Sequence, residues 1–318
     1  MLIVLNAVIP IFAIIFTGYI CAKAGILGPG ATDALNKFVV WLALPALLFQ
    51  AMAGINWREI DHPGFLAAYT GGMMLTFLVS FAHLPDAARV GGHKRLADRS
   101  IEGLNAAYAN TGFIGIPLCV AAFGAGALVP SAIATILTAC VLFAGAITLI
   151  ELDLSETPRL ASTIGRVARS LMRNPLLVAP VLGAGCAIGH AMLGVALPGP
   201  VLRFTALLAA AASPCALVTI GLFLAQSEAA RDTGVILRLV TLKLLVQPAI
   251  TFVLAFRVFE MPVMWAHTAL VLSALPIGTG PFMLAKLYDR EAAVTSRAIL
   301  VSTVISVVTV SALVAVLS

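Results

Sequence analysis

Two short stretches of this chain place polar, Gly and Pro residues inside apolar segments of membrane-spanning length. The residues concerned are Asn110, Thr111, Gly112, Gly115 and Pro117 in the first stretch, and Pro276, Gly278, Thr279, Gly280 and Pro281 in the second. Pro removes a backbone donor and Gly weakens a helix, so each segment is expected to unwind at mid-membrane depth. Unwound backbone is tolerated there only where protein buries it or where it lines a watery cavity. Two such breaks, one in each half of a chain, are typical of the binding site of a secondary transporter.

The polar side chains at the breaks suit the recognition of an organic anion. A helix N-terminus exposed at a break carries partial positive charge that favours a carboxylate, and Asn110 and Thr111 are expected to hydrogen-bond the same group. The alternative is that Asn110 only satisfies backbone groups freed by Pro117. Thr279 is a further candidate donor. The glycines are expected to allow close backbone approach at the breaks, and the prolines to set the geometry of the breaks without being ligands.

Lys243 is the one ionisable side chain predicted to lie well inside a span. With Gln247 and Thr251 it forms a polar stripe at spacing i, i+4, i+8, on one helix face. Intramembrane charges are costly and usually face the protein interior, so Lys243 is a candidate to neutralise an anionic substrate. The alternative is snorkelling, because Lys243 lies only about 10 Å from the inner end of its helix. Gln247, beside Pro248, is a candidate site residue or the cap of a bend.

Other chemistry finds little support in the sequence. No Asp or Glu lies deep in a predicted span, which argues against a proton antiporter built on a buried carboxylate pair and against a carboxylate-bound sodium site. Backbone carbonyls at the breaks remain possible ion ligands. No metalloprotease, nucleophile-elbow or P-loop motif occurs in a usable context, so neither an enzyme nor ATP-driven transport is expected. No metal and no cofactor are predicted.

The composition places these residues in a polytopic membrane protein. The chain is 61% hydrophobic and 10% charged, whereas a soluble domain is about 25% charged. Apolar segments of about 20 residues, each long enough to cross a bilayer, recur along the chain. The predicted spans are 2–22, 34–54, 64–84, 102–124, 129–150, 175–194, 201–225, 236–257, 266–287 and 296–317.

The distribution of basic residues predicts the orientation. If the N-terminus is outside, most of the 19 Lys and Arg residues fall in loops or helix ends on the inner side. Those left on the outer side are Arg58, Arg203 and Arg257. The positive-inside rule therefore favours ten spans with both termini outside. The net charge of +5 follows from these loops and is no footprint of nucleic-acid binding.

Landmarks recur across the charged loop 151–173, which divides the chain into repeats at about 1–150 and 174–318. The pairs are Asn6 and Asn174, Pro45 and Pro214, and Pro117 and Pro281, at offsets of 164 to 169 positions. Because each half has an odd number of spans, the second half enters the membrane from the opposite side. The prediction is a single all-α transmembrane domain built as a 5+5 inverted repeat, with substrate near the midplane.

These motifs resemble the auxin efflux carrier family, which includes bacterial organic-acid permeases. The matching residues are Leu44 to Phe49, Asn110-Thr111, Gly115 to Leu118, Leu275-Pro276, Gly278, Pro281-Phe282, Ala285-Lys286 and Tyr288. Within the second motif, the sequence Gly278-Thr279-Gly280-Pro281-Phe282 looks most like the corresponding sequence of malonate permeases. The resemblance implies two broken helices that cross at their unwound points, a scaffold group of helices and a moving carrier group, and a homodimer through the scaffold. Many family members have an Asn near Gly280 that this chain lacks, so its polar site chemistry is expected to depend more on the first break.

The function predicted from this sequence is secondary transport of a small organic anion, malonate or a related dicarboxylate, across the bacterial inner membrane. The lipid bilayer and the anion are the expected partners, with H⁺ or Na⁺ open as a coupling ion. One alternative is a sodium-coupled carrier of a larger amphipathic acid, similar in fold to bile-acid symporters. Sodium dependence of uptake would distinguish this alternative from the malonate carrier. Another is a membrane sensor without net flux, which a sealed-vesicle assay would identify.

Overall fold

The computed structural model describes residues 7–28, 30–54, 62–82, 96–154, 165, 172–194, 196–226, 232–290 and 292–317. These residues are helical, with no β-strand among them and one isolated β-bridge. The α-helices are α1 (Ile9–Lys23), α2 (Gly30–Phe38), α3 (Leu44–Ala53), α4 (Pro63–Ala82), α5 (Leu96–Ala107), α6 (Ile116–Phe123), α7 (Leu128–Leu137), α8 (Phe143–Leu154), α10 (Pro175–Leu193), α11 (Gly199–Ala225), α12 (Thr233–Thr241), α13 (Gln247–Val253), α14 (Val263–Ser273), α15 (Gly280–Leu287) and α16 (Ala293–Leu317). Short π or 3₁₀ turns join several of them, namely η2 (Val39–Ala43), η5 (Thr111–Gly115), η6 (Ala125–Ala127), η7 (Thr138–Leu142), η8 (Leu242–Val246) and η9 (Leu254–Val258).

Six continuous helices in the described part of the chain are long and apolar enough to cross a membrane. They are Gly30–Ala53, Pro63–Ala82, Pro175–Leu193, Gly199–Ala225, Thr233–Val258 and Ala293–Leu317. They coincide with the second, third, sixth, seventh, eighth and tenth predicted spans. Shorter apolar helices occupy the other four predicted spans, and two of these spans are interrupted as expected from their Gly and Pro content. The ten-span repeat itself stays a prediction.

The second interruption ends just before Pro281, whereas the first ends at Asn110, a helical turn and more ahead of Pro117. Pro281 occupies the first turn of α15, where a missing N–H has no helical partner to lose, whereas Pro117 lies in α6 directly after the helical turn η5. The non-helical residues are 108–110 and 274–279. Gly112 and Gly115 therefore lie in the π turn η5, and the expectation that this Gly-Pro stretch itself unwinds is wrong. At the second break Pro281 lies in the first turn of the next half-helix, whereas at the first break the next half-helix begins at Thr111, ahead of Pro117.

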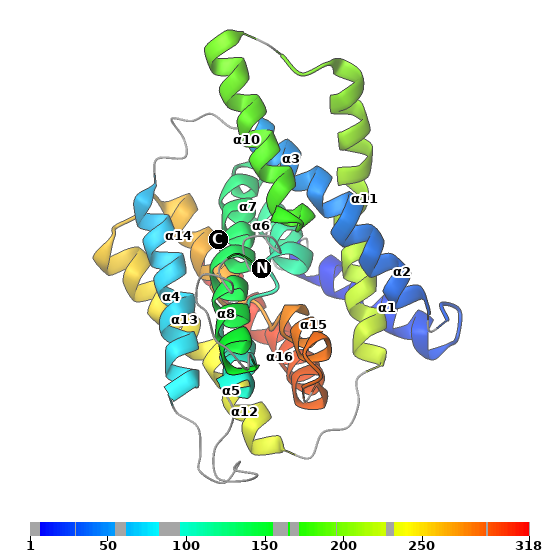
Figure 1. Ribbon diagram of the computed structural model, residues 1–318, viewed down its shortest axis with the longest axis vertical. Coiled ribbons are helices and arrows are strands. Elements are labelled where there is room, and N and C mark those ends of the chain that lie inside the picture. Colours follow the sequence, from blue (N-terminus) through cyan, green and yellow to red (C-terminus); the bar gives the residue numbers. More distant parts are fainter. Residues whose placement is uncertain are drawn as a thin grey trace.

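The helices pack as two groups (Figure 1). In the first group, α1 packs along α11, and α10 and α11 both pack on α3. The second group contains α4 to α8 and α12 to α16, in which α5 packs against α4 and α8, and α13 packs against α4 and α14. Contacts such as α11 with η5 and α3 with α7 join the two groups. Both interrupted spans belong to the second group.

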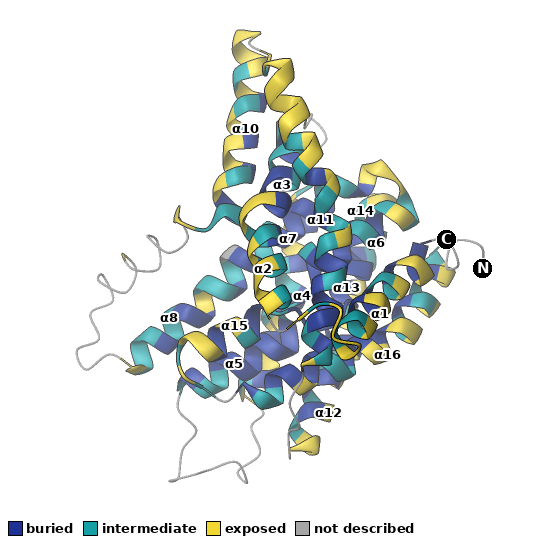
Figure 2. Cartoon of the chain, turned by 90° about the vertical axis from the view of Figure 1, so that its right-hand side faces the viewer, coloured by how far each residue is buried: buried dark blue, intermediate teal, exposed yellow. Residues whose placement is uncertain are grey.

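Burial differs between the groups (Figure 2). The second group contains most of the fully buried residues, whereas α10 and the adjoining part of α11 expose large apolar side chains. Val181, Met192 and Leu207 are 69%, 78% and 77% exposed. An exposed apolar surface of this kind suits lipid tails, which are as apolar as the side chains themselves.

Candidate functional site

The two unwound segments pair with each other, so each satisfies backbone groups that the other leaves free. The Asn110 N–H donates to the Pro276 carbonyl at 3.0 Å, and the Gly278 N–H donates to the Tyr108 carbonyl at 3.0 Å. Between these bonds Ala109 and Ile277 form an antiparallel bridge. Backbone groups buried without partners are costly, and this reciprocal pairing removes that cost where both helices are open. The broken helices therefore cross at residues 108–110 and 276–278.

The Asn110 side chain lies buried at this crossing. Asn110 and Thr111 are 4% and 3% exposed. The carbonyl of Asn110 accepts the N–H groups of Ile114 and Gly115, but its side chain caps no helix, and its Nδ2 has no hydrogen-bond partner among the described residues. An unpaired buried donor is costly unless something binds it. The amide nitrogen of Asn110 therefore donates to none of the backbone groups among the described residues.

The glycines of the two motifs lie where neighbouring groups approach closely. A Cβ on Gly278 or Gly280 would lie 2.9 or 2.7 Å from the ring of Tyr108. One on Gly115 would lie 2.7 Å from the Leu272 side chain, and one on Gly112 would lie 3.0 Å from that of Leu44. The closest distances are shorter than real Cβ contacts, so the crossing depends on the small size of these residues.

The polar stripe on the eighth predicted span faces the ends of both interrupted helices. Lys243 and Gln247 are fully buried. Lys243 Nζ donates to the Ser273 carbonyl at 2.6 Å, and Gln247 Nε2 donates to the Ala107 carbonyl at 3.1 Å. Ser273 and Ala107 are the last residues of α14 and α5, so each side chain caps a half-helix just before its break. Lys243 therefore does not snorkel. The Gln247 amide donates to the last carbonyl of α5 and does not cap the bend at Pro248.

A cavity of about 310 Å³ lies between the two helix groups. Its polar lining consists of Thr32, Asp33, Asn36, Thr219, Gln226, Thr279, Lys286 and Ser296. Thr279 is the N-cap residue of α15, so the cavity reaches the second break. Cavities that hold small ligands start at about 300 Å³, and this one has room for a small acid. Of the residues singled out from the sequence, Thr279 contributes to this cavity, whereas Asn110 and Lys243 belong to the crossing.

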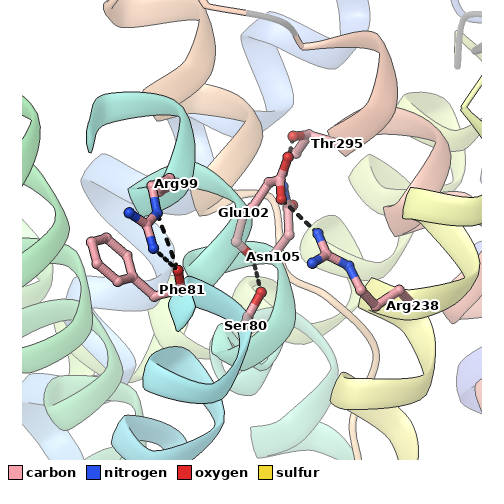
Figure 3. A network of polar contacts seen from close by, with 7 residues as sticks. All are labelled: Ser80, Phe81, Arg99, Glu102, Asn105, Arg238 and Thr295. Carbon is pink, nitrogen blue, oxygen red and sulfur yellow. Dashed lines mark hydrogen bonds and ion pairs between the residues drawn. The ribbon is translucent and has the colours of Figure 1, made fainter. Parts of the chain in front are cut away.

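A second polar cluster, along α5 between its two ends, was missed by the sequence reasoning (Figure 3). Arg238 of α12 forms an ion pair of 2.6 Å with Glu102 of α5, and Asn105 Nδ2 donates to Thr295 Oγ1 of α16 at 2.8 Å. Glu102 was expected at a span end, yet its side chain is only 12% exposed because Arg238 covers it. Glu102 and Asn105 lie one helical turn apart, and this spacing was the signal available in the sequence.

Comparison with known proteins agrees with this architecture. Residues 3–314 match the family described as "Membrane transport protein". The chain is 29% identical, over 96% of its length and 93% of the relative, to a protein of Rhizobium meliloti (strain 1021) named "Putative malonate transporter". It is also 33% identical, over 23% of its length and 8% of the relative, to the "Lysosomal cholesterol signaling protein" of Mus musculus. The resemblance found in the motifs is thereby confirmed, and the chain is an integral membrane protein that belongs to the auxin efflux carrier family of membrane transport proteins.

Proposed function

We propose that this protein is a secondary transporter that carries a small organic anion across the bacterial inner membrane by alternating access. The observation that carries the proposal is the crossing of two broken helices, with the unpaired amide of Asn110 buried beside it. Discontinuous helices that meet near the midplane form substrate sites in secondary transporters, because their ends present unpaired backbone groups and partial charges. Malonate or a related dicarboxylate is the proposed cargo, since the Rhizobium relative is named for malonate.

The proposed site joins the crossing to the cavity. One carboxylate of the substrate accepts hydrogen bonds from Asn110 Nδ2 and Thr111, and Thr279 at the N-terminus of α15 donates to the other. The helix N-termini at Thr111, where η5 leads into α6, and at Gly280 of α15 add partial positive charge, which favours an anion. The cavity of about 310 Å³ suits a small dicarboxylate better than a large amphipathic acid, which favours this function over a bile-acid-symporter-like carrier.

The proposed topology is ten spans in a 5+5 inverted repeat with both termini outside. Matching helix contacts in the two halves, away from the helix breaks, support the repeat. Gly18 of α1 lies against the backbone of Val218 in α11, and Gly183 of α10 lies against the Phe49 carbonyl of α3. Gly183 follows Gly18 by 165 positions and Val218 follows Phe49 by 169, which is the offset of the landmark pairs. In each half the first helix therefore packs on the second helix of the other half.

The proposed motion is elevator-like, with the second helix group moving against the first. The first group would form the scaffold, and the exposed apolar surface of α10 and α11 is the proposed contact of a homodimer. The cavity lies between the two groups, where relative movement of the groups would open or close it.

The test is uptake of radiolabelled malonate into proteoliposomes by wild type and Asn110→Ala, with and without an imposed proton gradient. We expect saturable wild-type uptake and, because a hydrogen bond to a charged group contributes about 1.5–3 kcal/mol, a loss of roughly tenfold or more in apparent affinity for the variant. Thr148→Ala is the matched control, because among the described residues that hydroxyl donates to the Ala144 carbonyl of its own helix. Absence of saturable uptake by folded wild type would overturn the malonate assignment, and unchanged uptake by Asn110→Ala would overturn the site.

A further inference from the structure

We propose that the ammonium group of Lys243 is a built-in cation at the C-terminal end of half-helix α14, in the place where a coupling Na⁺ would bind, so that transport does not require Na⁺. This inference deepens the proposed function and rests on it. It concerns whether the site requires a coupling Na⁺. Lys243 has a positioning role toward α14 and does not contact substrate.

The terminal carbonyls of α14 identify the position that Lys243 fills. The last four carbonyls of an α-helix have no helical partner. In α14 the Leu270 and Val271 carbonyls accept the Ala274 N–H, and the Leu272 carbonyl accepts the Leu275 N–H at 3.4 Å. The Ser273 carbonyl remains, and Lys243 Nζ donates to it at 2.6 Å. The ammonium therefore completes the end of the half-helix at the break.

The C-terminus of α14 supplies the negative partner of Lys243. Its side chain is fully buried, and among the described residues it has no carboxylate within ion-pair distance. The C-terminus of a helix carries about half a negative charge, and this end and the Ser273 carbonyl are the groups that stabilise the ammonium. In transporters with broken helices, Na⁺ is ligated by half-helix C-termini and unwound carbonyls. Lys243 supplies the same single positive charge to the same kind of end.

The other break provides an internal comparison. Gln247 lies one turn from Lys243 on the same stripe, and it caps the C-terminus of α5 through the Ala107 carbonyl with a neutral amide. The two half-helices thus receive equivalent hydrogen bonds, but only α14 receives a charge. One fixed positive charge near the crossing also favours the approach of an anionic substrate without a hydrogen bond to it.

The first experiment measures thermal unfolding of the purified protein in NaCl, KCl and choline chloride, and therefore requires no substrate. We expect the same melting temperature of wild type in all three salts. Lys243→Ala removes the ammonium and leaves space, so we expect a lower melting temperature that NaCl or ethylammonium chloride raises and choline chloride does not. Lys37→Ala is the control, because Lys37 is 71% exposed and pairs only with Asp33 at the surface. Stabilisation of wild type by Na⁺ over K⁺ and choline would overturn the inference, as would a Lys243→Ala variant as stable as wild type in every salt.

The second experiment measures malonate flux with Na⁺ replaced by choline on both sides of the membrane. We expect unchanged wild-type flux, loss of flux in Lys243→Met, which keeps the length without the charge, and partial flux in Lys243→Arg, which keeps the charge. Wild-type flux that depends on Na⁺, or full flux in Lys243→Met, contradicts the inference. If wild type carries no malonate at all, the substrate assignment fails while the melting experiment still decides the role of Lys243.

Discussion

The ring of Tyr108 accounts for the glycines of the second break. Tyr108 precedes the bridge between the two segments, and its ring lies over Gly278 and Gly280. The sequence favoured close approach as the reason for these glycines, and the packing shows which side chain makes that approach. The requirement is steric, since neither glycine has a positive φ.

Gly280→Ala is expected to destabilise the protein and to reduce transport together. The added Cβ would lie 2.7 Å from Tyr108 Cζ, and overpacking of this kind costs about 1–3 kcal/mol. Thermal unfolding and malonate uptake measure the two effects. Gly185→Ala is the control, because no atom lies within 4 Å of a Cβ there and Ala in a helix interior is about 0.5–1 kcal/mol more stable than Gly. A Gly280→Ala variant as stable as wild type would show that Tyr108 moves aside without cost.

Half-helix α5 is fixed at both ends by side chains from other elements. Gln247 caps its C-terminus at the crossing, and the Asp153 carboxylate accepts the N–H of Ala97 in its first turn. Between these ends the Glu102–Arg238 pair joins α5 to α12. A short helix inside a broken span has few backbone bonds of its own, so these tertiary contacts determine its position. They hold α5 to α12 within the second helix group.

Glu102→Gln is expected to lower the stability of this connection. Removing one partner of a fully buried pair costs about 3–5 kcal/mol, and since Arg238 retains 21% exposure we expect about 1–3 kcal/mol here. Thermal unfolding of Glu102→Gln, of Arg238→Gln and of the double variant measures the coupling, and the double variant should lose less than the sum of the two. Asp33→Asn is the control, because the Asp33–Lys37 pair is exposed and should contribute about 0–1 kcal/mol. Additive losses would mean that the pair has no energetic coupling.

The whole molecule consists of two helix groups with the cavity between them (Figure 1). The cavity is lined by Thr32 and Lys286, which lie near helix ends that the positive-inside rule assigns to the inner side. The proposed conformation is therefore open inward, with Thr279 at the end of the path and the crossing beyond it. Alternating access requires that this path close while an outer one opens.

Thr279→Cys, in a background without the native cysteines, is expected to react with a membrane-impermeant thiol reagent applied from the inner side. Malonate should slow this reaction, because the substrate would occupy the path to Thr279. Labelling of right-side-out and inverted vesicles measures the side and the protection. Ser131→Cys is the control, since Ser131 is fully buried in α7 and should not react. Labelling from the outer side alone would reverse the proposed conformation.

The sequence alone determined the class of the protein, its family, and the two spans that are interrupted. These properties depend on composition, on apolar segment length and on local Gly and Pro content, which act without distant partners. The close packing at Gly115, Gly278 and Gly280 was also expected from their small size.

Only the tertiary structure decided where the helices open and what the polar stripe does. The first break lies at residues 108–110, where Tyr108 and Asn110 find backbone partners in the second break, and not at the Gly-Pro stretch that follows it. The partners of Lys243 and Gln247 are carbonyls 30 and 140 residues away, and Glu102 is covered by Arg238 from 136 residues away. Helical periodicity indicates that a side chain faces the interior, but which groups meet it depends on how the other helices pack.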